Sequence, residues 1–144
     1  MADSKFRVKA RSKNPTKVVV KARSFEMIID EPTEQGGTND GANPVEYVLA
    51  ALSGCLNVMC HLIANEMGFT LRGVEIKIAG SLNSDKLMGK ETTDRAGFKE
   101  VDVEIIPDTD ADDDTLKKWI KVVEERCPVS DTISNSTPLK ITLA

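Results

Sequence analysis

Apolar and polar residues alternate near the start of the chain, the period-two pattern of β-strands with one buried face. Residues 6–11 alternate apolar with basic side chains, and the apolar run 18–20 follows a Lys-Asn-Pro-Thr segment at 13–16 that has the composition of a turn. This pattern predicts a β-hairpin. The run 27–29, Met-Ile-Ile, predicts a third strand, which ends at Asp-Glu-Pro, 30–32, before a glycine-rich loop.

Residues 43–67 have the pattern of one long amphipathic α-helix. Asn43 is a good N-cap, Pro44 suits the first helical position, and Glu46 completes a capping box. Cys55 lies on the apolar stripe and is predicted to face the core, in a helix of about 24 residues. The stripe recurs at steps of three and four residues: Val48, Leu52, Cys55, Met59 and Leu62.

Two further strands are predicted in the second half of the chain. Apolar residues alternate with charged ones over 74–78 and again over 101–105, and each segment predicts a half-buried strand. A polar stretch, 83–97, joins the two. The two strands are therefore expected to follow the long helix as part of a mostly antiparallel sheet.

The last third of the chain predicts helices and a closing strand. The acidic run 108–114 precedes apolar positions 116, 119, 120 and 123, which share one helix face, so the run is a solvated helix start. Alternation at 139–143 predicts a final strand. This order of elements is typical of an α+β fold. The length of 144 residues suits one domain over 1–144.

Composition narrows the classes of partner. A net charge of -4 disfavours nucleic acids and anionic membranes, which bind clustered cations, and 4% aromatic residues leaves little for base stacking. The N-terminal residues form no apolar signal segment, and apolar runs are too short for a membrane span. The predicted location is the cytoplasm.

Three cysteines without an export signal favour reduced thiols over structural disulfides. Cys127 precedes Pro128 and is predicted to cap a short helix, whose positive end favours the thiolate. Cys55, on an apolar face, is expected to have a raised pKa unless an arginine reaches it. Simple packing is the alternative for each thiol. Their complementary settings suggest thiol redox chemistry.

Metal binding is not expected. Cys60 and His61 are ligand types, but neither shares a helix face with Cys55, and the sequence contains no second Cys-x-x-Cys or His-x-x-x-His set. Cys60 is expected to pack in the core. The sequence therefore predicts neither a metal nor another cofactor.

Several short motifs occur in an order that resembles the OsmC and Ohr proteins, a family of thiol-dependent hydroperoxide reductases. The Asn-Pro-x-Glu motif ends nine residues before Cys55, and Cys127 follows Cys55 by 72 residues. The resemblance covers nearly the whole chain. Its motifs are Asp30-Glu31-Pro32, Gly36-Gly37-Thr38, Asn43-Pro44-x-Glu46, Ser53-Gly54-Cys55 and Cys127-Pro128-Val129-Ser130.

The resemblance implies a fold and a catalytic cycle. Family members are intertwined homodimers, with sheets wrapped around a long central helix and active sites at the subunit interface. By this resemblance the Cys55 thiolate attacks a hydroperoxide, Cys127 forms a disulfide with the resulting sulfenic acid, and an external dithiol reduces it. A Glu and an Arg assist the thiolate.

Glu46 and Arg23 are the residues chosen for these assisting roles, with Arg11 as the second choice for the arginine. In the organic-hydroperoxide branch the Glu directly follows the Pro, but here Val45 takes that position and Glu46 comes one residue later. The alternative for Glu46 is therefore a purely structural role as the capping partner of Asn43. The alternative for Arg23 and for Arg11 is an ordinary solvent-exposed strand residue without a catalytic role. The alternative function is a non-catalytic OsmC-like protein that senses redox state, or binds a small ligand or partner in the interfacial cleft.

Overall fold

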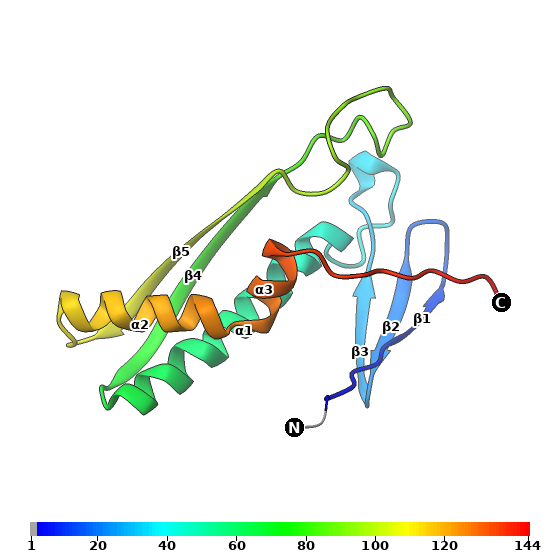
Figure 1. Cartoon of the computed structure of the whole chain (residues 1–144). Helices are drawn as coiled ribbons and strands as arrows, with labels where there is room; N and C mark the ends of the chain where they lie inside the picture. Colours follow the sequence, from blue (N-terminus) through cyan, green and yellow to red (C-terminus); the bar gives the residue numbers. More distant parts are fainter. Residues whose placement is uncertain (1–2) are drawn as a thin grey trace. The chain divides into compact units, whose positions relative to one another are not determined.

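The computed structural model describes residues 3–144, which fall into two compact units, 3–48 and 49–144. Five strands, three α-helices and a short 3₁₀ helix, η1 (Thr33–Gln35), make up the regular structure, and both sheets are antiparallel (Figure 1). This arrangement confirms the predicted α+β class. The expectation of a single domain stays a prediction.

The first unit contains a three-stranded antiparallel meander. Strand β1 (Lys9–Ser12) pairs with β2 (Val18–Ala22), which pairs with β3 (Phe25–Ile29). The Lys13 N–H donates to the Lys17 carbonyl at 2.8 Å and closes the first turn, as the pattern predicted. Strand β1 is shorter than expected, because the register pairs Lys9 with Lys21 near the end of β2 and leaves earlier residues without a partner.

A buried carboxylate organises the loop that follows β3. Asp30 is fully buried, and each of its oxygens accepts hydrogen bonds from loop groups. Burial raises the pKa of this carboxyl, but the hydrogen bonds, that from Thr38 first, outweigh burial and hold the pKa well below its usual range. Its donors are the hydroxyls of Thr16 and Thr38 and the backbone N–H groups of Glu31, Thr38 and Asp40.

Helix α1 (Pro44–Met67) begins and ends where the sequence predicts. The Asn43 N–H donates to Glu46 at 3.0 Å and the Glu46 N–H donates to the Asn43 side chain at 2.9 Å, a complete capping box. Gly68, with φ +80°, follows the last turn. By length and composition alone α1 also meets the criteria for a membrane span, as a core helix does. Six of its residues are buried: Leu52, Leu56, Met59, Cys60, Ile63 and Ala64.

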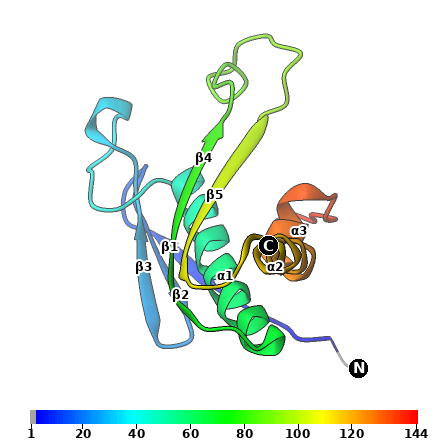
Figure 2. The same cartoon turned by 90° about the vertical axis from the view of Figure 1, so that its left-hand side faces the viewer.

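The second unit packs a β-hairpin against helices. Strands β4 (Leu71–Ser81) and β5 (Glu100–Thr109) pair along their lengths, and helix α2 (Asp113–Arg126) lies beside α1 in both views (Figures 1 and 2). Trp119 of α2 is fully buried and donates from Nε1 to the Cys60 carbonyl of α1 at 2.9 Å. The predicted core face of α2 is therefore confirmed at Trp119 and Val123.

The prediction of a final strand over residues 139–143 is wrong, because this segment forms no strand in the structure. The short helix α3 (Pro128–Ser134) is followed by ten residues without regular structure. Leu139, Ile141 and Leu143 are 84%, 86% and 101% exposed. Alternation shows which face of a strand would be buried, but a strand also requires a partner edge, and no strand within residues 3–144 pairs with this segment.

Candidate active site

Two cysteines that are 72 residues apart in the chain meet in the second unit. Cys55 lies on α1, and Cys127 lies at the junction of α2 and α3. Their Sγ atoms are 3.1 Å apart, and the Cys127 thiol donates a hydrogen bond to Cys55. Both thiols are free, and their separation exceeds the 2.03–2.05 Å of a disulfide bond. The arrangement is that of a reduced dithiol in direct contact.

Cys127 is the deeper member of the pair. It is fully buried and caps α3, where its sulfur accepts the Ser130 N–H at 3.4 Å. Burial, followed by the hydrogen bond to Cys55, raises the pKa of the Cys127 thiol despite the opposing backbone N–H groups of Ser130 and Val129. The backbone donors at this helix start favour the Cys127 thiolate as predicted, but loss of water outweighs them, so the net effect is a raised pKa.

Cys55 is only partly buried, so it is the member of the pair that solvent reaches. It packs against the edge of the apolar core rather than inside it, and its neighbours Leu52 and Leu56 supply the buried contacts of this part of α1. The buried face of α1 is thus rotated slightly from the predicted apolar stripe. Val48 and Leu62, which belong to the predicted stripe, are 41% and 42% exposed.

The third thiol, Cys60, packs in the core as expected. It is fully buried, and burial, with the nearby charge of Cys127, raises its pKa to about 11. A thiol with such a pKa is almost wholly protonated near neutral pH. Within the described part of the chain, no three His, Cys, Asp or Glu side chains are grouped to hold a metal ion.

The assisting residues predicted from the sequence belong to the first unit. Glu46 is engaged in the capping box with Asn43. Arg23 lies in the turn between β2 and β3 rather than on a strand, with φ +55° and its guanidinium 5.0 Å from the centre of the Phe25 ring. Arg11 lies on β1 and is exposed. A catalytic role for any of the three stays a prediction.

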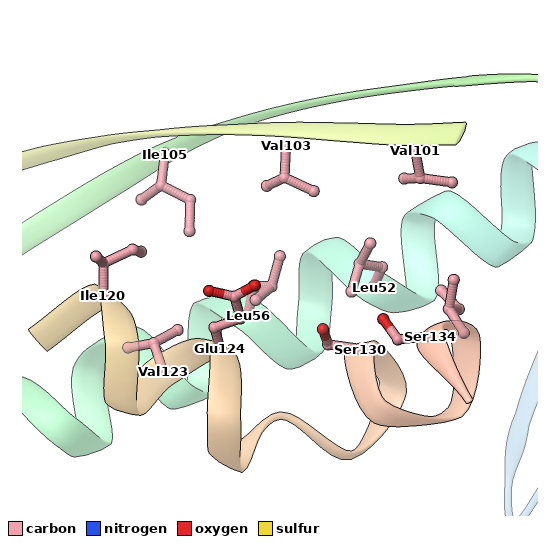
Figure 3. Close-up of a pocket in the computed structure, with 11 residues that line it drawn as sticks. Leu52, Leu56, Val101, Val103, Ile105, Ile120, Val123, Glu124, Ser130 and Ser134 are labelled. Atoms are coloured by element: carbon pink, nitrogen blue, oxygen red, sulfur yellow. The ribbon is translucent and has the colours of Figure 1, made fainter.

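A cavity of about 380 Å³ lies between β5 and the three helices, and sequence reasoning did not predict it (Figure 3). Neither Cys55 nor Cys127 lines it. Ser130, whose N–H contacts the Cys127 sulfur, lines it, as do Leu52 and Leu56, which flank Cys55 on α1. Glu124 is the one charged residue of the lining. Its position four residues after Ile120 on α2 is the sequence signal that places it beside the apolar face. The other lining residues are Val101, Val103, Ile105, Ile120, Val123, Ile133 and Ser134.

Solved structures share this fold. An OsmC-like protein from Mycoplasma pneumoniae is 20% identical with a TM-score of 0.81, covering 92% of this chain and 89% of its own. An organic hydroperoxide resistance protein OsmC from Legionella pneumophila is 22% identical with a TM-score of 0.69, covering 92% and 91%. An organic hydroperoxide resistance protein from Elizabethkingia anophelis is 19% identical with a TM-score of 0.58, and the match covers 90% of this chain and 88% of that protein.

The sequence itself carries the family assignment. No curated protein matches the chain. The family of OsmC-like proteins matches residues 37–142, a segment that includes the capping box, both thiols of the pair and the cavity. With a match over well more than half its length, the chain belongs to the OsmC-like family.

Proposed function

We propose that this protein is a thiol-dependent peroxidase that reduces organic hydroperoxides or hydrogen peroxide. The observation that carries the proposal is the 3.1 Å contact between the Cys55 and Cys127 sulfurs, one accessible and one buried. Two of the similar structures are named organic hydroperoxide resistance proteins, which supports the same activity here. The chemistry requires no metal or cofactor, only thiols and a reductant.

Cys55 is the attacking thiol in this proposal, because peroxide reaches it from solvent while Cys127 is buried. The Cys127 S–H donates to the Cys55 sulfur and stabilises negative charge there. The Cys55 thiolate attacks the distal oxygen of ROOH, the O–O bond breaks, and RO⁻ takes a proton and leaves as ROH. Cys55 is left as a sulfenic acid.

Cys127 completes the oxidative half of the cycle. Its thiol loses a proton and attacks the Cys55 sulfenic sulfur, water leaves, and a Cys55–Cys127 disulfide forms. The sulfurs already touch, so closure requires an approach of about 1 Å from 3.1 Å to the bonded distance. An external dithiol then reduces the disulfide by exchange and is itself oxidised.

Glu46 and Arg23 complete the proposed catalytic set, with Arg11 as the alternative arginine. In family members a Glu and an Arg hold the thiolate and polarise the peroxide. Glu46→Gln separates this role from capping, because Gln also forms capping boxes but carries no charge. If Glu46 acts only as a cap, Glu46→Gln retains wild-type kcat/KM and Glu46→Ala lowers stability alone.

We further propose a cytoplasmic homodimer with interfacial active sites. Two features of the described chain support a dimer. Leu139, Ile141 and Leu143 alternate in a segment that leaves these apolar side chains exposed. The two-stranded β4–β5 sheet has two edges that could pair with strands of a second chain. Isolated two-stranded sheets are marginal in water. Light scattering after size exclusion should give twice the chain mass of 15.7 kDa. Ile141→Lys with Leu143→Lys should give monomer.

One stoichiometric peroxide experiment tests the activity. Reduced protein is mixed with one equivalent of cumene hydroperoxide and analysed by peptide mass spectrometry. Wild type should form the Cys55–Cys127 disulfide within seconds to minutes. Cys127→Ser should stop at oxidised Cys55, Cys55→Ser should not react, and Cys60→Ser should behave as wild type. Slow oxidation spread over all three thiols would contradict the proposal.

The second candidate is a non-catalytic member of the family that binds an apolar ligand. The cavity between β5 and the helices is the observation that favours it, because eight of its eleven lining residues are apolar. In that case peroxide would oxidise the thiols slowly and without selectivity, and apolar ligands would still bind to the reduced protein.

A further inference from the structure

Basic residues are concentrated in one short segment of this chain. Residues 5–23 contain eight of the 19 lysines and arginines and no aspartate or glutamate, although the whole chain has a net charge of -4. We propose that four of these cations, on one face of the first sheet, bind the phosphate backbone of a single-stranded nucleic acid without reading its bases. This binding is a function separate from the proposed thiol chemistry.

The four cations line one pocket of about 400 Å³ in the first unit. Lys9 and Arg11 occupy alternate positions of β1, so their side chains project from the same face of the sheet. The register places Lys21 of β2 directly opposite Lys9, on that same face. The lining residues are Lys9, Ala10, Arg11, Lys13, Val19, Lys21 and Glu26.

These four side chains are exposed, and their charges still act together. Residues two positions apart on a strand are separated by about 6.6 Å, and directly opposite residues by about 4.5–5.5 Å. Both spacings are shorter than the screening length of about 8–10 Å at physiological salt. A polyanion with closely spaced charges therefore meets several cations at once, and each contact releases a condensed counterion.

Little within the chain compensates these charges. Lys9, Arg11 and Lys13 take part in no ion pair among residues 3–144. Lys21 forms one ion pair, with Glu26 at 3.5 Å, but both side chains are more than half exposed, so the pair contributes little. Most of the positive charge of the pocket is thus available to a ligand.

The position of Lys21 opposite Lys9 is itself unfavourable for folding. Like charges directly opposite each other on antiparallel strands are destabilising. Lysines on an edge strand such as β1 prevent pairing with other sheets, but Lys21 lies on β2, the central strand of the meander (Figure 1). Protection of an edge therefore explains Lys9 and not Lys21, whereas binding of a polyanion explains both.

The other lining residues favour one class of polyanion. Among the described residues no aromatic side chain lines the pocket, so bases have no platform for stacking. Ala10 and Val19 offer little apolar area for insertion into a bilayer. A bound peptide typically pairs with a strand edge, whereas these cations project from the face. A flexible single strand can bend into the pocket, but a duplex is stiff over about 150 base pairs.

Salt dependence measures the number of phosphate contacts. Binding of a fluorescein-labelled oligothymidylate of about 20 nucleotides to the full chain is followed by anisotropy between about 25 and 200 mM NaCl. With four cations on phosphates, the slope of the logarithm of the association constant against that of the salt concentration should be about -3. An oligocytidylate of the same length should bind within about threefold of the oligothymidylate.

Removing the opposed lysines should weaken binding without weakening the fold. Lys9→Gln with Lys21→Gln should reduce the slope to about -1.4 and lower the affinity at least about tenfold at about 50 mM NaCl. The Tm should be unchanged or higher, because the like-charge pair is gone. A merely structural role of these lysines would not give this combination. Arg11→Gln with Lys13→Gln is a second pair with the same expected loss of affinity.

Lys117→Gln with Lys121→Gln is the matched control, because it removes the same charge from exposed positions of α2 outside the pocket. It should keep the wild-type slope and an affinity within about twofold of wild type. A wild-type slope shallower than about -1, or equal weakening by the control, would overturn the proposal. So would displacement of the oligonucleotide by an equal charge concentration of poly-glutamate or of phosphatidylserine vesicles, which would indicate an acidic protein or a membrane instead.

Discussion

The two units of the chain bury chemically different groups. In residues 3–48 the buried polar centre is the Asp30 carboxylate, which stays charged because hydroxyl and backbone donors surround it. In residues 49–144 the buried titratable groups are the thiols of Cys60 and Cys127, which sit among apolar side chains. Burial raises the pKa of an acid in both units, and the number of hydrogen-bond donors around the group decides whether the net pKa is lowered, as for Asp30, or raised, as for Cys127.

This contrast explains where reactivity is expected. A thiol buried with few donors remains protonated and serves as a hydrogen-bond donor, as Cys127 does toward Cys55. In the proposed cycle the partly exposed partner, Cys55, is the thiol that meets the peroxide. A carboxylate with as many donors as Asp30 has no free lone pair for chemistry, and its contribution is structural.

The largest expected effect is on thiol alkylation. A pKa of about 11 against an ordinary 9.0 leaves Cys60 with about a hundredfold less thiolate near neutral pH, in addition to its lack of access. Iodoacetamide at pH 7.5 should label Cys55 first, followed by Cys127 and last Cys60, as read by peptide mass spectrometry. Comparable labelling of Cys60 and Cys55 in folded protein would contradict this order.

Removing the apolar centre of the second unit should have the largest effect on stability. Trp119→Ala deletes a fully buried ring and should lower the free energy of unfolding by about 3–5 kcal/mol in urea titrations. Trp119→Phe, which mainly loses the indole bond to Cys60, should cost less. Hydrogen exchange should accelerate chiefly within 49–144. Equal acceleration in both units would show that they do not open separately.

Removing the charged centre of the first unit should have a smaller, pH-dependent effect. Asp30→Asn presents an amide N–H₂ to groups that are themselves donors, so it should lower the Tm and accelerate hydrogen exchange chiefly within 3–48.

The sign of the pH dependence follows from the lowered pKa of Asp30. Its stabilisation is fully present above the unfolded value near 4 and is lost as pH falls through the lower folded value. The Tm of wild type should therefore decrease below about pH 4 more steeply than that of Asp30→Asn. Parallel Tm profiles for the two proteins would contradict this assignment.

The smallest expected effect is at the start of α1. Asn43→Ala removes the side chain that accepts the Glu46 N–H and should lower the free energy of unfolding by about 1 kcal/mol. The far-UV circular dichroism of the folded protein should be unchanged. A loss comparable to that of Trp119→Ala would mean that Asn43 does more than cap the helix.

Features encoded in neighbouring residues were predictable from the sequence. The capping box at Asn43 and Glu46, the glycine end of α1 and the cap position of Cys127 depend on short segments, and the structure contains all three. The family resemblance also rests on such motifs and is confirmed by the match over residues 37–142.

Features that depend on distant contacts were not predictable in this way. The raised pKa of Cys127 results from core residues brought together by folding, which no local dipole argument includes. The segment 139–143 has the alternation of a strand but pairs with no strand within residues 3–144. Glu124 is exposed in the structure, and it lines the cavity only because β5 lies across from α2.

The 72-residue separation of the two touching sulfurs also bears on protein lifetime. A covalent bond between them would close a long loop and, by restricting the unfolded chain, stabilise the fold by about 4 kcal/mol. The oxidised protein would thus resist heat and proteases better than the reduced form. In the proposed cycle, a shortage of reductant would therefore leave a durable oxidised protein rather than one that is readily degraded.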